Sequence, residues 1–234
     1  MAETAVKTAT EREPLFGKVE RQLITDPLAE NNPITVQVLG ICSALAVTSL
    51  VYPSLVMAVA VVFVCAFSSL ITSLLRNLIP KQVRLIVQLV VIATLVTVVN
   101  YALQALSYPV YKQLSVYIGL IITNCIVMGR LEAFAMANKP WRSFLDGLGN
   151  GLGYGLILII VAFFRELFGK GTLLAGSGIT LNIIGASTEE VSYLINIPGF
   201  LNNNLMVMPV SAMLVIAILI WLQRARNPKL VDIS

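Results

Sequence analysis

Polar and apolar residues form long separate blocks along the chain and do not alternate every few residues. Residues 1–33 are mostly polar, and six apolar stretches follow, separated by charged or turn-forming residues. A membrane-spanning helix needs roughly 17–25 apolar residues, so each stretch is a candidate span. The six stretches are residues 34–51, 54–75, 83–106, 113–128, 144–164 and 205–222. The pattern predicts an all-α integral membrane protein with six transmembrane helices.

The same pattern predicts how the chain is divided. Residues 1–33 lack the apolar core of a signal peptide, so we interpret them as a polar cytoplasmic arm. Residues 34–222 form the six-helix membrane domain, and residues 223–234 a cytoplasmic tail. The polar stretch from residue 169 to 204 is expected to be an outer loop, with a short interfacial helix around Thr188–Ile195.

Composition supports a membrane protein and excludes a nucleic-acid-binding one. The chain is 57% hydrophobic and 12% charged, whereas soluble domains carry about 25% charged residues. Its net charge of +4 reflects basic residues between the apolar stretches. The expected surroundings are therefore a lipid bilayer, and no nucleic-acid partner is expected.

The distribution of Lys and Arg predicts the orientation. Of the sixteen Lys and Arg residues, all but Lys112, Arg165 and Lys170 lie in the arm, the second-to-third loop, the fourth-to-fifth loop and the tail. Basic loops stay on the cytoplasmic side of a membrane. Both termini are therefore expected to be cytoplasmic.

An internal repeat divides the membrane domain into two halves. Cys42 lies in the first span and Cys125 in the fourth, while Leu75–Leu78 and Phe164–Leu167 end the second and fifth spans with similar sequences. Three spans per half give the halves opposite orientations. Inverted repeats place functional sites on short or interrupted helices near the middle of the membrane. The first and fourth spans are therefore expected to be short or interrupted and to carry such a site.

Cys42 and Cys125 are the candidate metal ligands. The chain contains no histidine, so thiolates are its only soft ligands. Two cysteines make half of the four-cysteine set that holds an iron–sulfur cluster. The alternative is that they pack as small apolar residues. Cys65 has no polar neighbour and no counterpart in the other half, so we assign it that packing role.

Five residues beside this cysteine pair are expected to support it. Their small or polar side chains allow the helices to open, so that backbone N–H groups can donate to sulfur. They are Gly40, Ser43, Thr123, Asn124 and Gly129.

Other polar residues carry weaker hypotheses. Oxygen atoms of Thr123, Asn124, Asn150 and Asn100 are alternatives for a hard cation such as Na+, although hydrogen bonding between helices is their commoner role. The ion path itself cannot be assigned.

The sequence between residues 146 and 155 is rich in glycine but has no nucleotide-binding spacing. Residues 147, 151 and 155 would share one helix face, and residues 149 and 153 another, which favours close packing on two sides.

Glu132, Asp146 and Glu166 lie near span ends, and we expect Glu132 to pair with Arg130 and Glu166 with Arg165.

Longer motifs resemble a known family. The segments that carry the resemblance are Asn31–Pro33, Gln37–Thr48, Lys112–Arg130, Asp146–Gly155 and Phe163–Gly169. They resemble the NqrD family, which belongs to the Na+-translocating NADH:quinone oxidoreductases, and the similarity extends over residues 31–222.

The resemblance implies a multi-subunit enzyme of the bacterial inner membrane. It implies that Cys42 and Cys125 supply half of the ligands of a 2Fe-2S cluster shared with NqrE, the homologous membrane subunit. The cluster would relay electrons between the flavin-bearing NqrB and NqrC, in a complex with NqrA and NqrF that couples NADH oxidation by ubiquinone to Na+ export. The chain would bind no flavin or NADH directly and would not be catalytic alone.

The sequence departs from the family pattern in places. Leu131 stands where the family has alanine, and the arm and the 169–204 loop are longer than usual. Two alternatives to the redox subunit stay open: the equivalent subunit of the Rnf ferredoxin:NAD complex, which shares the cysteine motifs, and an iron-free secondary transporter, which the inverted repeat alone would also fit.

Overall fold

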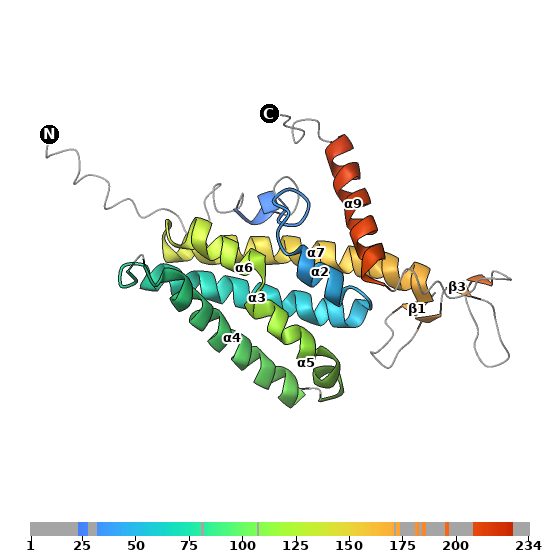
Figure 1. The fold of residues 1–234 in the computed structure, drawn as a ribbon, viewed down its shortest axis with the longest axis horizontal. Coiled ribbons are helices and arrows are strands. Elements are labelled where there is room, and N and C mark those ends of the chain that lie inside the picture. The colour runs from blue at the N-terminus through green and yellow to red at the C-terminus, as the bar shows by residue number, and fades with distance from the viewer. Residues whose placement is uncertain are drawn as a thin grey trace, which may run out of the picture.

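The computed structural model describes most of the membrane domain (Figure 1). The described residues are 23–27, 32–80, 82–106, 108–170 and 208–226, together with four residue pairs in the 171–207 region. The arm before residue 23 lies outside them, as does the interfacial helix predicted around Thr188–Ile195 except for Ile195 itself, which belongs to one of these pairs.

Helices make up almost all of the described structure. In chain order they are α2 (Ile41–Val47), α3 (Val51–Leu75), α4 (Arg84–Leu106), α5 (Tyr108–Ile122), α6 (Cys125–Arg130), a π-helical turn η1 (Leu131–Ala135), α7 (Pro140–Lys170) and α9 (Pro209–Arg226). Residues 23–27 form one further helical turn. The prediction of an all-α membrane protein is confirmed.

The strands are only two residues long. Thr172–Leu173 (β1) pairs antiparallel with Leu181–Asn182 (β2), and Ile184–Gly185 (β3) pairs parallel with Ile195–Asn196 (β4). They lie beyond the end of α7, in the stretch that the sequence predicts to be a loop.

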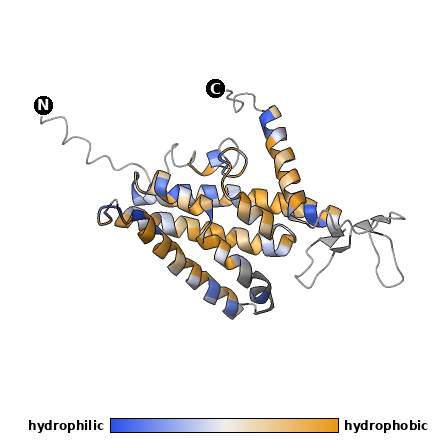
Figure 2. Ribbon diagram, in the orientation of Figure 1, coloured by the Kyte–Doolittle hydropathy of each residue, from blue (hydrophilic) through white to orange (hydrophobic). Residues whose placement is uncertain are grey.

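Four helical segments of the described chain are long and apolar enough to cross a membrane. They are Val51–Leu75, Arg84–Ala105, Tyr117–Ala135 and Pro140–Gly169, and Pro209–Ala225 is a shorter apolar helix. Apolar residues dominate all of them (Figure 2). They correspond to the second to sixth predicted spans.

The first predicted span differs from a regular helix. Residues 32–40 form turns, and only Ile41–Val47 is helical in that region. Val38 and Gly40 both have left-handed backbone conformations, with φ values of 58° and 75°, which a right-handed helix cannot include. The fourth span is also divided, because Thr123 and Asn124 separate α5 from α6. Interrupted first and fourth helices are thus confirmed.

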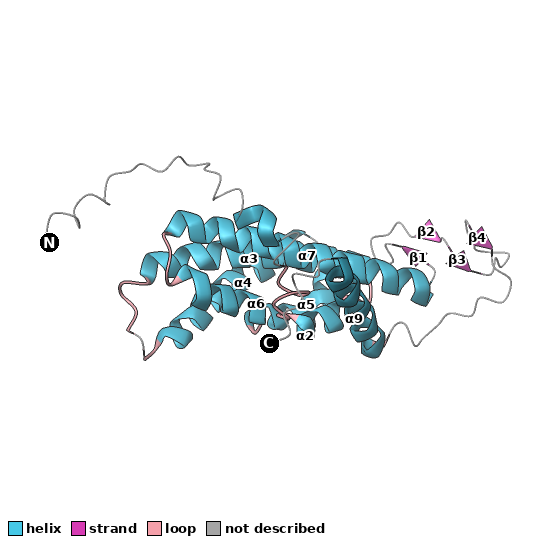
Figure 3. Cartoon of the chain, turned by 90° about the horizontal axis from the view of Figure 1, so that it is seen from above, coloured by secondary structure: helices cyan, strands magenta, loops and turns pink. Residues whose placement is uncertain are grey.

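The core of the molecule lies around α3 and α7, which run side by side in both views (Figures 1 and 3). Three glycines allow this approach: a Cβ atom added at Gly147, Gly151 or Gly155 would lie 2.7 Å from the Cys65 carbonyl oxygen, 2.8 Å from Val62 Cα and 3.0 Å from Ala58 Cβ, respectively.

The other glycine face contacts the chain that precedes α2. Added Cβ atoms at Gly149 and Gly153 would lie 2.5 Å from the carbonyl oxygens of Leu23 and Pro27. The Asn32 side chain donates to the Gly153 carbonyl at 3.1 Å. The predicted two-sided packing of α7 is confirmed, and α7 therefore holds α3 on one side and the entry to α2 on the other.

One predicted ion pair is wrong. Glu132 pairs with Arg84 rather than with Arg130, and it also accepts a hydrogen bond from Gln88 at 3.1 Å. Arg130 instead pairs with the buried Asp146 of α7. Residues two positions apart on a helix do not face each other, so Arg130 and Glu132 take partners on different elements.

The ends of the two long core helices are held in similar ways. Arg76, just after α3, donates to the Asn138 carbonyl at 2.8 Å, ahead of α7. Arg165, near the end of α7, donates to Thr48 Oγ1 at 2.6 Å, ahead of α3, and Glu166 accepts from the Val51 N–H at 2.6 Å. Each arginine thus binds a residue that precedes the other helix.

Candidate functional site

Cys42 lies at the start of α2, directly after a sharp backbone turn. Gly40 is the residue before the helix, and its left-handed conformation (φ 75°, ψ 18°) is one that glycine adopts without strain. Ser43 Oγ donates to the Gly40 carbonyl at 3.0 Å and so closes the turn. The backbone N–H groups of Cys42 and Ser43 lie next to Cys42 Sγ. The local fold therefore places backbone donors beside this sulfur.

Cys125 is the first residue of α6, in the matching position of the second half. Asn124 precedes it in an extended conformation and caps the helix, because its Oδ1 accepts from the Ile126 N–H at 3.3 Å. Asn124 is fully buried, and its Nδ2 has no hydrogen-bond partner among the described residues. A buried amide donor without a partner is costly, so this group is suited to donate to an acceptor at the site.

The two interrupted helices bring Cys42 and Cys125 together. Their thiols lie close enough to influence each other, although 83 positions separate them in the chain. Both are exposed at the surface of this chain, whereas Cys65 is fully buried in the core. Among the described residues, no three His, Cys, Asp or Glu side chains gather as a metal-binding group. The chain thus presents a pair of adjacent thiols on its surface.

The supporting residues predicted from the sequence occupy different places. Gly40, Ser43 and Asn124 lie at the two helix starts. Thr123 lies in the break before α6 and is exposed. Gly129 lies inside α6 and does not open a helix, so its predicted part in the interruption is wrong; the break falls where Asn124 can cap the helix.

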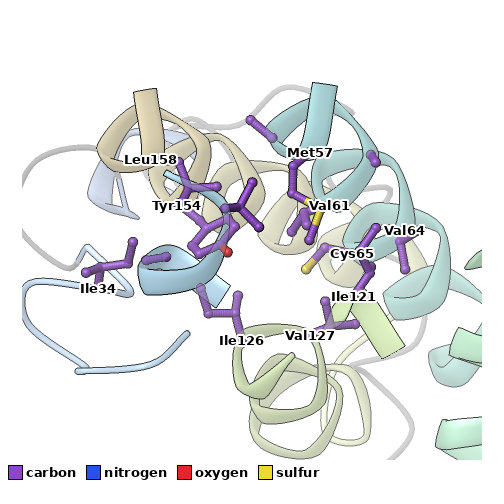
Figure 4. Close-up of a cluster of buried hydrophobic side chains, with 14 of the residues drawn as sticks. Ile34, Met57, Val61, Val64, Cys65, Ile121, Ile126, Val127, Tyr154 and Leu158 are labelled. Carbon is purple, nitrogen blue, oxygen red and sulfur yellow. The ribbon is translucent and has the colours of Figure 1, made fainter. Parts of the chain in front are cut away.

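Sequence reasoning missed Tyr154 of α7. Its ring is fully buried, and its hydroxyl lies 2.6 Å from Ser43 Oγ. The hydroxyl also lies beside the Asn124 side chain. Figure 4 shows the Tyr154 ring extending from α7 toward the ribbon of α2, and Ile126 lies on the side of α2 away from α7. The available signal was that Tyr154 is the one aromatic residue in the glycine-rich run from Asp146 to Gly155.

Comparison with known proteins identifies the family. The family described as "Rnf-Nqr subunit, membrane protein" matches residues 21–220. The chain belongs to this Rnf-Nqr family.

Curated relatives within the family carry a more specific name. The NqrD subunit of the Na(+)-translocating NADH-quinone reductase of Shewanella halifaxensis is 51% identical over 92% of this chain and 97% of its own length. The proteins of the same name from Shewanella baltica strain OS155 and Shewanella putrefaciens are also 51% identical, over the same shares. The resemblance seen in the sequence motifs is therefore confirmed across nearly the whole length of these Rnf-Nqr subunits.

Proposed function

We propose that this chain is the NqrD subunit of a Na+-translocating NADH:quinone oxidoreductase, in which Cys42 and Cys125 supply half of the ligands of a 2Fe-2S cluster. The observation that carries the proposal is the adjacent, exposed pair of thiols at the starts of α2 and α6. The names of the relatives support the enzyme, and they favour the Na+-translocating complex over the Rnf ferredoxin:NAD complex.

The residues at the site fit such a cluster. Two cysteines match half of a four-thiolate set. An anionic cluster in a membrane needs hydrogen-bond donors, and the N–H groups of the first turns, which have no acceptor within a helix, supply them. The buried Asn124 amide has two N–H groups and can supply a further donor. Exposure of both thiols leaves room for ligands from a second chain.

The chain's contribution is to hold the ligands rather than to carry out chemistry alone. When bound, the cluster would supply one-electron transfer at a place within the membrane. The two helix starts fix the positions of the thiols, and the backbone N–H groups beside them can donate to the sulfur atoms of a bound cluster. The partner for the remaining ligands is the homologous NqrE; the flavin-bearing NqrB and NqrC, with NqrA and NqrF, complete the complex in the bacterial inner membrane.

A secondary transporter without iron is the alternative from a different class, since it would use the same inverted repeat. Iron content separates the two functions. The chain produced alone in membranes should hold little iron, because it offers two of the four thiolates. Co-production with NqrE should give an iron-containing complex with visible absorption. A stable cluster in the chain alone would refute the shared site, and an iron-free complex that still assembles would favour the transporter.

The orientation is tested by reporter fusions. Fusions after Ser234 and within residues 77–82 should report a cytoplasmic location, and fusions within residues 170–200 a periplasmic one. The reason is the concentration of Lys and Arg in the arm, two of the loops and the tail. A paired alkaline phosphatase and fluorescent protein assay measures this directly, and a periplasmic C-terminus would contradict the six-span arrangement.

A further inference from the structure

Tyr154 connects the two helix starts to α7. Its hydroxyl lies 2.6 Å from Ser43 Oγ, next in sequence to Cys42, and beside the side chain of Asn124, next in sequence to Cys125. All three residues are fully buried. A single side chain of the core therefore reaches the neighbour of each thiol.

The donors and acceptors in this cluster have one consistent order. Ser43 has a single hydroxyl proton, which it donates to the Gly40 carbonyl at 3.0 Å. Tyr154 must then donate its own proton to Ser43 Oγ. Because Asn124 Oδ1 already accepts from the Ile126 N–H, the free Nδ2 is the part of the amide that can donate to the Tyr154 oxygen. Hydrogen bonds thus run from Tyr154 through Ser43 to the Gly40 carbonyl, and the Asn124 amide lies beside the same hydroxyl, so Tyr154 adjoins both breaks.

Packing of the ring limits movement of the same two breaks. A Cβ atom added at Gly40 would lie 3.1 Å from Tyr154 Cε2 and 2.8 Å from Ile126 Cδ1. The turn before α2 is thus enclosed between the tyrosine ring of α7 and the first turn of α6. A shift of the α2 start would therefore change its packing against this ring and its hydrogen bond to Tyr154.

We propose that Tyr154 is a positioning residue that sets the separation of the Cys42 and Cys125 thiols through Ser43 and Asn124. The use of this separation to bind a cluster rests on the proposed function, whereas the separation itself is a property of this chain. Loss of the Tyr154 hydroxyl removes its hydrogen bond to Ser43 and its contact with the Asn124 side chain, while the ring continues to fill the core.

The test measures how fast the two thiols form a disulfide in the assembled complex. Cys65→Ala is present throughout, iron is removed with a chelator under reducing conditions, and a mild oxidant is then added. Mass spectrometry of the peptides follows the Cys42–Cys125 disulfide over time. Because small misplacements strongly slow reactions between positioned groups, Tyr154→Phe should lower the rate by about tenfold.

Two further variants make the result decisive. Val161→Ala removes two methyl groups from a fully buried side chain of the same helix, away from the cluster of hydrogen bonds, and should leave the rate unchanged although it weakens packing. Ser43→Ala removes the hydroxyl that Tyr154 contacts and should lower the rate of disulfide formation as Tyr154→Phe does. If the complex with Tyr154→Phe does not assemble, the rate measured for Ser43→Ala tests the proposal instead. Unchanged rates in the hydroxyl variants overturn the proposal. A complex without iron would defeat the proposed function but leave this comparison valid.

Discussion

Replacing Cys42 or Cys125 with alanine abolishes electron flow from NADH to quinone in the assembled complex, whereas Cys65→Ala largely preserves it. The reason is that the two exposed thiols are the proposed ligands and lie side by side at the helix starts. Cys65 lies fully buried among apolar side chains, and a change to alanine there removes only a sulfur atom from the core. Quinone reduction by the purified complex, with NADH as donor, measures the effect.

The Cys65→Ala variant is the matched control for this prediction. All three cysteines lie in apolar stretches of the sequence, so a general effect of removing a thiol would appear in each variant. If Cys65 proved as necessary as the other two, the assignment of the ligands would be wrong. Full activity in Cys42→Ala or Cys125→Ala would lead to the same conclusion.

Gly40→Val is expected to prevent assembly of the site and to remove most of the iron. A left-handed conformation costs a residue other than glycine about 1–2 kcal/mol, and Gly40 has φ 75°. The added side chain would also meet Ile126 Cδ1 at 2.8 Å and Tyr154 Cε2 at 3.1 Å, and overpacking typically costs about 1–3 kcal/mol more. Iron per purified complex, together with the yield of complex, measures the loss.

Gly129→Val is the control for Gly40→Val. A Cβ atom at Gly129 would have only Leu39 Cδ1 near it, at 3.4 Å, which is ordinary contact. Gly129 also lies inside α6 rather than at its start. The iron content of Gly129→Val should therefore be close to that of the unsubstituted complex. Equal iron in both variants would show that the turn at Gly40 does not determine the site.

Much of the fold follows from the sequence because lipid imposes a simple pattern on it. Apolar stretches of spanning length predict the long helices, and the Gly-Ile-Cys-Ser and Thr-Asn-Cys contexts indicate where the first and fourth spans are interrupted. Glycine spacing within α7 predicts its two close-packed faces, since such spacing has a direct geometric meaning on a helix.

Other features depend on tertiary contacts that carry no local signal. Hydropathy places residues 34–51 in a span, but the left-handed Val38 and Gly40 make most of that stretch non-helical. Glu132 pairs with Arg84 of another helix, which no pairing rule between near neighbours predicts. Tyr154 becomes part of the site only because the fold brings α7 against the turn at Gly40.

The proposed shared cluster is tested most directly by iron and acid-labile sulfide in the purified complex, compared among the unsubstituted, Cys125→Ala and Cys65→Ala forms. The account predicts that Cys125→Ala loses the iron and sulfide that belong to this site, while Cys65→Ala retains the full amounts. Iron and sulfide contents that stay the same in Cys125→Ala would contradict it.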